Sequence, residues 1–209
     1  LYFAGLGVTL KVAFFAAILG LVIGTVIALM KLSTGKKGKG TIWSFIANCY
    51  IDVIRGTPSV LQLLIMWFII MKSCKNGVLV AVLSFGINSG AYVAEIIRSG
   101  IMSIDKGQME AGRSLGFNYA QTMWYVIMPQ AFKTVLPTLC NEFISLLKET
   151  SVSGYIAIQD LTKGGDIIRS RTYSAFMPLI AVALVYLVIV MIFTKLIQIL
   201  ERRLRQSER

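Results

Sequence analysis

The sequence predicts an all-α membrane protein with about five transmembrane helices and one short cytoplasmic helix. Of its 209 residues, 56% are hydrophobic and 15% are charged, and the mean hydropathy of +0.73 is too high for an ordinary soluble domain. Residues 3–30 contain one charge, Lys11, and about 20 apolar residues are enough to cross a bilayer as a helix. We expect a single transmembrane domain over residues 1–209.

Long apolar segments predict five spans, at about residues 6–30, 58–71, 78–97, 125–147 and 175–199. The second is long enough to cross only if it borrows residues from 42–57. The fourth contains Lys133, Asn141 and Glu142. Because ionisable residues inside spans face the protein interior or a water-filled cavity, we expect this helix to face the interior rather than lipid.

Basic residues set the predicted orientation. With the first span running from outside to inside, the inner segments are 31–57, 98–124 and 200–209, and the outer segments are 72–77 and 148–174. The inner segments hold twelve Lys and Arg residues and the outer segments hold six. Because cytoplasmic loops carry an excess of these residues, we expect the N-terminus outside and the C-terminus in the cytoplasm.

The net charge of +11 raises the question of an anionic partner. The basic run from Lys31 to Lys39 is interleaved with glycine and would form a cytoplasmic turn near anionic headgroups. Gly35 and Gly40 imitate the spacing of a phosphate-binding loop, but Thr41 stands where that loop needs its lysine. We therefore expect membrane lipid as a partner, no nucleic acid, and no ATP site in this chain.

The composition excludes several enzyme classes. The chain has no histidine, which excludes His-based triads and histidine metal sites, and its three cysteines are too widely spaced for a metal site or a disulfide framework. Glu142 and Glu149 have no nucleophile, base or ligand set at a suitable spacing. We expect no catalytic residue, no metal site and no cofactor.

Small residues recur on one face of the first span. Ala16, Gly20, Gly24 and Ala28 are four residues apart and therefore lie one above another on a helix. Such a stripe lets the backbone of a second helix approach closely. We expect the first span to pack against another helix along this line.

Residues 105–124 are predicted to form a cytoplasmic loop that contains a short helix. Gly116 would end this helix, and Pro129 would interrupt the helical segment that leads back to the membrane. A short helix held parallel to the membrane between two spans is a docking element for a cytoplasmic partner.

This loop resembles the signature of the permease subunits of ABC importers. That signature is Glu-Ala-Ala, three residues, Gly, nine residues, and Ile-x-Leu-Pro. The chain has Glu110, Ala111, Gly116 and Pro129 at the corresponding positions.

The chain departs from the signature at three positions. Gly112 replaces the second Ala, Val126 replaces Ile and Met128 replaces Leu. The last two stay apolar, whereas Gly112 should weaken the helix by about 1 kcal/mol relative to Ala.

More of the chain resembles the polar amino-acid branch of this family. The similar pieces are, in order, Arg55-Gly56-Thr57-Pro58, Gln62, Asn88-Ser89, Ala91 to Glu95, Arg98 to Ile101, Lys106-Gly107-Gln108, Pro129-Gln130-Ala131, Asn141 to Ser151 and Glu201-Arg202-Arg203. The resemblance covers nearly all of the chain. It implies the type I permease architecture of ABC importers and a location in a prokaryotic cell (inner) membrane.

The resemblance also implies a function and a set of partners. The chain would import a polar amino acid by alternating access without hydrolysing ATP itself. It would pair with a second permease, either an identical copy or a paralogue, above two cytoplasmic ATPase subunits that bind ATP and Mg. An extracytoplasmic solute-binding protein would deliver the substrate.

Residues 109–117 would be the coupling helix, which seats in a groove of the ATPase. The residues implied are Met109, Glu110, Ala111, Gly112, Arg113, Leu115, Gly116 and Phe117. We expect the apolar ones, Met109, Leu115 and Phe117, to be buried against the partner, and the charged ones to fix the register. The alternative is an ordinary capped amphipathic loop helix.

Two polar stripes inside the predicted spans are candidates for a substrate pathway. On the third span the stripe consists of Ser84, Asn88, Tyr92 and Glu95. On the fourth it consists of Thr138, Glu142, Ser145 and Glu149, with Asn141 and Lys148 beside it. Each spacing places its residues on one helix face, so the two faces together can line one pathway.

We expect the substrate to contact Gln62, Asn88, Tyr92, Asn141 and Glu149. The carboxylate of Glu149 can meet an ammonium or guanidinium group, which slightly favours a cationic substrate such as arginine or lysine. The alternative is that these polar groups only satisfy one another between helices. Glu95 and Arg98 are expected to form a local ion pair near the cytoplasmic boundary.

A channel or secondary transporter that needs no ATPase is the alternative from another functional class. Inverted repeats would support it, and the two halves of the sequence show no similarity. Five spans are also few for a transporter that works alone. Co-purification with a soluble ATPase would distinguish the two functions.

Overall fold

The computed structural model describes residues 1–33 and 40–206, a part of the chain that is almost entirely helical and contains no strand. The predicted all-α fold is confirmed. The predicted turn of the basic run includes Lys36, Lys37 and Lys39, which lie outside the described residues. In chain order the elements are α1 (Tyr2–Leu32), α2 (Ile42–Arg55), α3 (Ser59–Ile65) with a π-helical extension (Met66–Ile70), α4 (Gly77–Met102), α5 (Lys106–Ser114), α6 (Tyr119–Thr122) with a π-helical extension (Met123–Ile127), α7 (Met128–Glu149), a 3₁₀ helix (Thr150–Ile156), α8 (Leu161–Thr172) and α9 (Phe176–Gln206).

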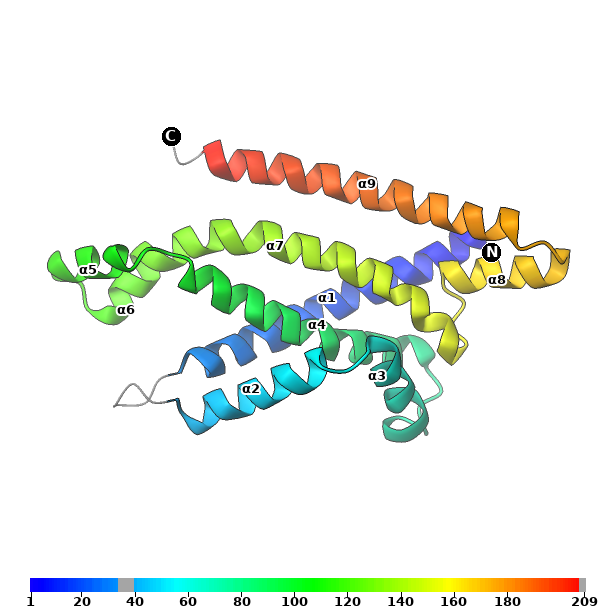
Figure 1. Ribbon diagram of the computed structural model, residues 1–209, viewed down its shortest axis with the longest axis horizontal. Coiled ribbons are helices and arrows are strands. Elements are labelled where there is room, and N and C mark those ends of the chain that lie inside the picture. The colour runs from blue at the N-terminus through cyan, green and yellow to red at the C-terminus, as the bar shows by residue number, and fades with distance from the viewer. Residues whose placement is uncertain (34–39, 207–209) are drawn as a thin grey trace.

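Four long helices, α1, α4, α7 and α9, run along the length of the molecule (Figure 1). α9 ends at the same end of the molecule as α5 and α6, whereas the N-terminus lies at the end that holds α8 (Figure 1). The start of α1 and the end of α9 are therefore at opposite ends, as expected for a chain whose termini lie on opposite sides of a membrane. Which of them faces the cytoplasm stays a prediction.

Within the described residues, three helices are long and apolar enough to cross a membrane, over Tyr2–Leu32, Gly77–Met102 and Phe176–Leu204. Residues Ile42–Arg55 and Ser59–Ile70 pass the same test only as a pair, and they are bent by 102°. The second predicted span, 58–71 with residues borrowed from 42–57, is therefore not a straight helix. α7 is not among these candidates, so the number of five spans stays a prediction.

The small-residue stripe of α1 packs against another helix, as predicted, and the structure shows that this helix is α4. Ala16, Gly20, Gly24 and Ala28 are all buried. A Cβ atom on Gly24 would lie 2.5 Å from the Cβ of Val93, and one on Gly90 would lie 2.8 Å from Cγ2 of Ile23. Each helix thus places a glycine against a branched side chain of the other, which brings the two backbones close together.

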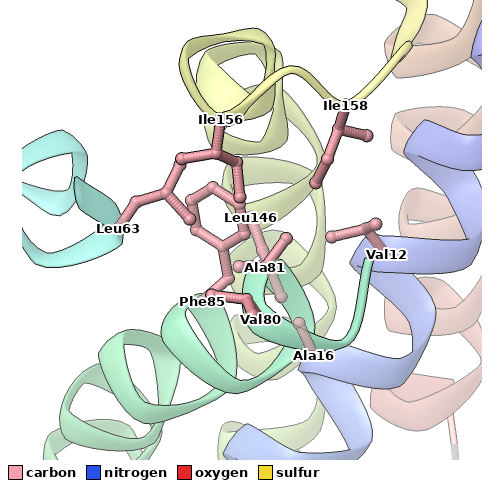
Figure 2. Close-up of a cluster of buried hydrophobic side chains, with 9 residues drawn as sticks. All are labelled: Val12, Ala16, Leu63, Val80, Ala81, Phe85, Leu146, Ile156 and Ile158. Carbon is pink, nitrogen blue, oxygen red and sulfur yellow. The ribbon is translucent and has the colours of Figure 1, made fainter. Parts of the chain in front are cut away.

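The main hydrophobic core lies where α1 and α4 meet α3, α7 and the segment after α7. Its buried members, shown in Figure 2, are Val12, Ala16, Leu63, Val80, Ala81, Phe85, Leu146, Ile156 and Ile158. This core fixes the short helix α3 to the long helices despite the bend that separates it from α2.

A hydrogen bond joins the start of α8 to α1. Leu161 N donates to Thr9 Oγ1 at 3.2 Å, and Asp160 Oδ1 accepts the N–H of Lys163 at 3.0 Å as the cap of α8. Burial raises the pKa of the Asp160 carboxyl, which lies in the predicted outer segment. A Cβ atom on Gly5 would lie 2.5 Å from Asp160 O, so this contact depends on glycine.

Candidate functional site

Gln62 holds the corner between α2 and α3. Pro58 lacks an N–H and restricts the residue before it, so α2 cannot continue through this position. Gln62 Nε2 donates to Ile54 O at 2.8 Å and to Thr57 Oγ1 at 2.7 Å. These bonds tie the first turn of α3 to the end of α2 across the 102° bend.

Asn88 joins this corner from α4. Its Nδ2 donates to Gln62 Oε1 at 2.9 Å, and the residue is only 3% exposed. A buried amide is costly unless it is hydrogen-bonded, so this bond supports the position of both residues. In this conformation the two amides satisfy one another, and their contact with a substrate stays a prediction.

Tyr92 lies one helical turn after Asn88 and meets the end of α2. Arg55 Cζ lies over the Tyr92 ring, 5.2 Å from its centroid, a cation–π contact. Arg55 is exposed, and within residues 1–33 and 40–206 it forms no ion pair with a carboxylate. The structure therefore gathers Gln62, Asn88, Tyr92 and Arg55 at one place.

Two carboxylates, seven residues apart, lie on one face of α7. Ser89 Oγ donates to Glu142 Oε1 at 3.0 Å and so links α4 to α7. Glu149 is partly buried, and its carboxylate forms no hydrogen bond or ion pair with another described residue. Among the described residues, no group of three His, Cys, Asp or Glu side chains could hold a metal ion.

Asn141 lies apart from the other predicted substrate residues. It is exposed and lines a polar groove of about 340 Å³ between α7 and α9, together with Lys133, Thr138 and Glu201. Glu142, the next residue, instead lines a cavity of about 530 Å³ among the apolar side chains of α1, α4, α7 and α9. Adjacent helical residues point about 100° apart, which explains the separation.

Glu95 forms the predicted ion pair with Arg98, and it also accepts a hydrogen bond from a second cation. Arg98 Nη2 lies 3.0 Å from Glu95 Oε2, and Lys31 Nζ donates to Glu95 Oε1. Lys31 lies in the last turn of α1, and Glu95 belongs to α4. The cluster therefore joins these two helices, beyond the local pair that we expected.

α5 is the short helix predicted within 105–124, but it begins and ends earlier than the predicted 109–117. Asp105 caps it by accepting the N–H of Gly107 at 2.6 Å. At the other end Gly116 has φ +88°, its N–H donates to Arg113 O at 3.0 Å, and Phe117 N donates to Gly112 O at 3.2 Å. This is a Schellman motif, which favours glycine, so the prediction that Gly116 terminates the helix is confirmed, although the last helical residue is Ser114.

The surface of α5 and of the turn after it is largely open. Glu110, Ala111 and Arg113 are exposed, and Leu115 is 80% exposed. Phe117 is 39% exposed and contacts the Tyr125 ring at 6.4 Å between centroids, whereas Met109 is partly covered by the chain itself. An apolar surface is therefore available to a partner, and its burial there stays a prediction.

Gly112 has a packing role that its helix propensity does not indicate. It is buried against Thr122, which is itself fully buried. A Cβ atom at 112 would collide with Thr122 Cγ2 and lie 3.0 Å from its Oγ1. Glycine here lets α6 and α5 approach, so it does more than weaken the helix.

Comparison with known proteins now identifies the family. Residues 20–206 match the family described as binding-protein-dependent transport system inner membrane component. The chain belongs to this family. It is 40% identical over 207 residues to the arginine transport system permease protein ArtQ of Bacillus subtilis (strain 168), over 98% of this chain and 92% of that protein.

Two further relatives agree with this membership. This inner membrane component is 34% identical over 203 residues to the L-cystine transport system permease protein TcyB of Bacillus subtilis (strain 168), over 96% of this chain and 85% of that protein. A crystal structure described as an amino acid ABC transporter with histidines superposes with a TM-score of 0.89 and 46% identity, over 97% of this chain and 93% of that one. The predicted ABC importer permease architecture is confirmed.

Sequence reasoning did not single out Arg55 or Ser89 as site residues of this inner membrane component. Both lay within the pieces that resemble the family, and Arg55 also directly precedes the Gly-Thr-Pro turn beside an apolar segment. Their partners, Tyr92 and Glu142, lie 37 and 53 residues away along the chain. No local spacing could therefore have paired them.

Proposed function

We propose that this inner membrane component is the membrane-spanning subunit of an ATP-driven importer that carries a polar amino acid by alternating access. The observation that carries the proposal is its similarity, over nearly the whole chain, to permeases named for arginine and for cystine transport. ATP and Mg would bind to a separate ATPase subunit, because Thr41 replaces the lysine of a phosphate-binding loop.

α7 supplies the polar wall that such a pathway needs. Thr134, Thr138, Asn141 and Lys148 are exposed along it, at spacings of four, three and seven residues that place them on one face. At membrane depth, polar side chains line a cavity or contact protein rather than lipid. This face would line the substrate pathway where the chain meets a second permease, an identical copy or a paralogue.

The exposed surface of α5 would seat in the ATPase, with Leu115 and Phe117 as apolar contacts. α5 lies at the same end of the molecule as the end of α9, which supports a shared cytoplasmic side (Figure 1). The N-terminus would then face outward, in a prokaryotic cell (inner) membrane. A solute-binding protein would deliver the amino acid to that outer side.

Glu149 is the candidate for selecting a cationic amino acid such as arginine or lysine. Its carboxylate has no hydrogen-bond or ion-pair partner among the described residues, so it is available to an ammonium or guanidinium group. Gln62, Asn88 and Tyr92 would contribute polar contacts from α3 and α4, and Asn141 from the exposed face of α7.

The test is ATP-dependent uptake of labelled arginine and glutamine into proteoliposomes that hold this chain with its partner subunits and binding protein. Glu149→Gln should lower the efficiency of arginine uptake roughly 10-fold or more, because a hydrogen bond to a charged group contributes about 1.5–3 kcal/mol. Glutamine uptake should change little. The control is Asp166→Asn, which removes a half-exposed carboxylate on α8 that pairs with Lys163 and Arg169. Unchanged arginine uptake in Glu149→Gln would move substrate selection to the binding protein.

A further inference from the structure

The cavity beside Glu142 lies between two pairs of helices. α1 packs on α4 and α9 packs on α7, and the cavity of about 530 Å³ is lined by all four helices. Phe143 of α7 meets Phe193 of α9 edge to face, with 5.3 Å between the ring centroids, and both rings line the cavity. A volume of this size is typical of a pocket for a small molecule.

The cavity opens sideways, toward the membrane. Phe14 and Ile18 near the middle of α1, and Leu196 of α9, line it and are each about half exposed. Apart from one hydrogen-bonded pair, Ser89 and Glu142, its lining is apolar. The middle of a membrane span is surrounded by hydrocarbon, so acyl chains have direct access to this cavity.

The cavity also faces away from the proposed contact with a second permease. That contact uses the polar face of α7, which carries Thr134, Thr138 and Asn141. Leu139 and Phe143 line the cavity from nearly the opposite face of α7, because successive helical residues point about 100° apart. Lipid is therefore the expected neighbour on this side.

Positive charge lies where the cavity ends. Phe193, Leu196 and Leu200 line it from α9, and Arg203 continues their face at spacings of three, four and three residues. Arg203 is exposed, and it lies at the end of α9 that shares its side of the molecule with α5 (Figure 1). Basic residues beside a gap between helices on the cytoplasmic side are suited to bind anionic lipid headgroups.

We propose that this cavity binds an acyl chain of an anionic phospholipid, whose headgroup phosphate pairs with Arg203. The chain would fill the space between α1 and α9 and cover the contact of Ser89 with Glu142 from the membrane side. The lipid would thus support the packing of α7 and α9 against α1 and α4. This inference goes beyond the proposed function, because it holds whichever amino acid is carried.

The test is photo-cross-linking of the assembled transporter in phosphatidylcholine nanodiscs that contain phosphatidylglycerol with a diazirine in the middle of one acyl chain. Mass spectrometry of the peptides should find the label concentrated on cavity residues such as Leu139 and Phe143. Unlabelled phosphatidylglycerol should compete about fivefold better than phosphatidylcholine with the same chains. This ratio corresponds to the contribution of about 1 kcal/mol from one basic residue near the membrane surface.

The headgroup contact is tested by Arg203→Gln, which should remove the preference for phosphatidylglycerol in the competition. Arg202→Gln is the matched control, since it removes the neighbouring exposed charge from a different face of α9. The control should keep the wild-type preference. Equal losses in the two variants would contradict the assignment of the headgroup to Arg203.

The acyl-chain contact is tested by Ile18→Trp, which should fill the opening and remove most of the label from Leu139 and Phe143. Val26→Trp is the matched control, because Val26 is also exposed on α1 but does not line the cavity. Should Ile18→Trp fail to assemble, Leu196→Trp fills the same cavity from α9 and must have the same effect.

Three outcomes would overturn the inference. Label spread evenly over the exposed apolar residues of α9 would indicate ordinary surrounding lipid. Equal competition by the two phospholipids would show that no anionic headgroup is recognised. Cavity residues that stay unlabelled while the exposed residues of α9 are labelled would show that protein, such as the second permease, covers the cavity. Each outcome leaves the proposed import of amino acids standing, because uptake is measured separately.

Discussion

At the scale of single residues, Gln62 and Asn88 carry the contact between the α2–α3 corner and α4. Their pattern in the sequence indicated polar groups inside apolar segments, which was enough to nominate both. It could not indicate that they bond to each other, because the pairing depends on the 102° bend and joins residues 26 positions apart. Glu149 could be nominated from its spacing alone, whereas the contact between Arg55 and Tyr92 became visible only in the structure.

Gln62→Ala should lower the free energy of unfolding by about 1–3 kcal/mol, because it leaves the buried Asn88 amide without its acceptor. Asn88→Ala should have a similar effect. The double variant should cost less than the sum of the two, because it removes both partners together. Thermal unfolding of the four proteins in detergent measures this, and strictly additive losses would contradict the contact.

At the scale of elements, the stripe on α1 correctly predicted a close helix pair, although only the structure identified α4 as the partner. The end of α5 at Gly116 was also predictable, because the positive φ of a Schellman motif favours glycine. Its start was predicted three residues late, because the family signature begins at Glu110, whereas the cap of the helix is Asp105.

Gly24→Ala should destabilise the α1–α4 pair by about 1–3 kcal/mol, because the added Cβ would lie 2.5 Å from Val93 and force the helices apart. Gly7→Ala on the same helix is the matched control, since nothing lies within 4 Å of a Cβ there. Thermal unfolding should separate the two variants. Equal midpoints would argue against the close packing of α1 on α4.

Gly112→Ala should weaken coupling to the ATPase, although alanine is the better helix former, because the new methyl group collides with Thr122. Thr122→Ser removes the methyl Cγ2 and keeps a hydroxyl that can donate to Asn118 O, so the double variant should recover much of the loss. The readout is transport-coupled ATPase activity in proteoliposomes. A Gly112→Ala variant as active as the wild type would show that coupling does not depend on the close packing of α6 against α5 at Gly112.

At the scale of the whole molecule, hydropathy was sufficient to predict a helical membrane domain and the resemblance was sufficient to predict its family. The path of the chain between α1 and α4 was not predictable, because a run of apolar residues does not reveal a sharp bend inside it. The number of spans is hard to predict for a related reason. α7 combines polar and apolar residues, and a helix that faces a polar pathway is less hydrophobic than one that faces lipid.

The central claim is that this chain transports only when an ATPase drives it. The most direct test is amino-acid uptake into proteoliposomes that contain the chain with its binding protein and partner permease, and either an active ATPase, an ATPase inactivated in its ATP-hydrolysing residues, or none. We predict accumulation against a gradient with the active ATPase alone. Uptake without an active ATPase, driven by the substrate or ion gradient, would contradict the account and indicate a channel or secondary transporter.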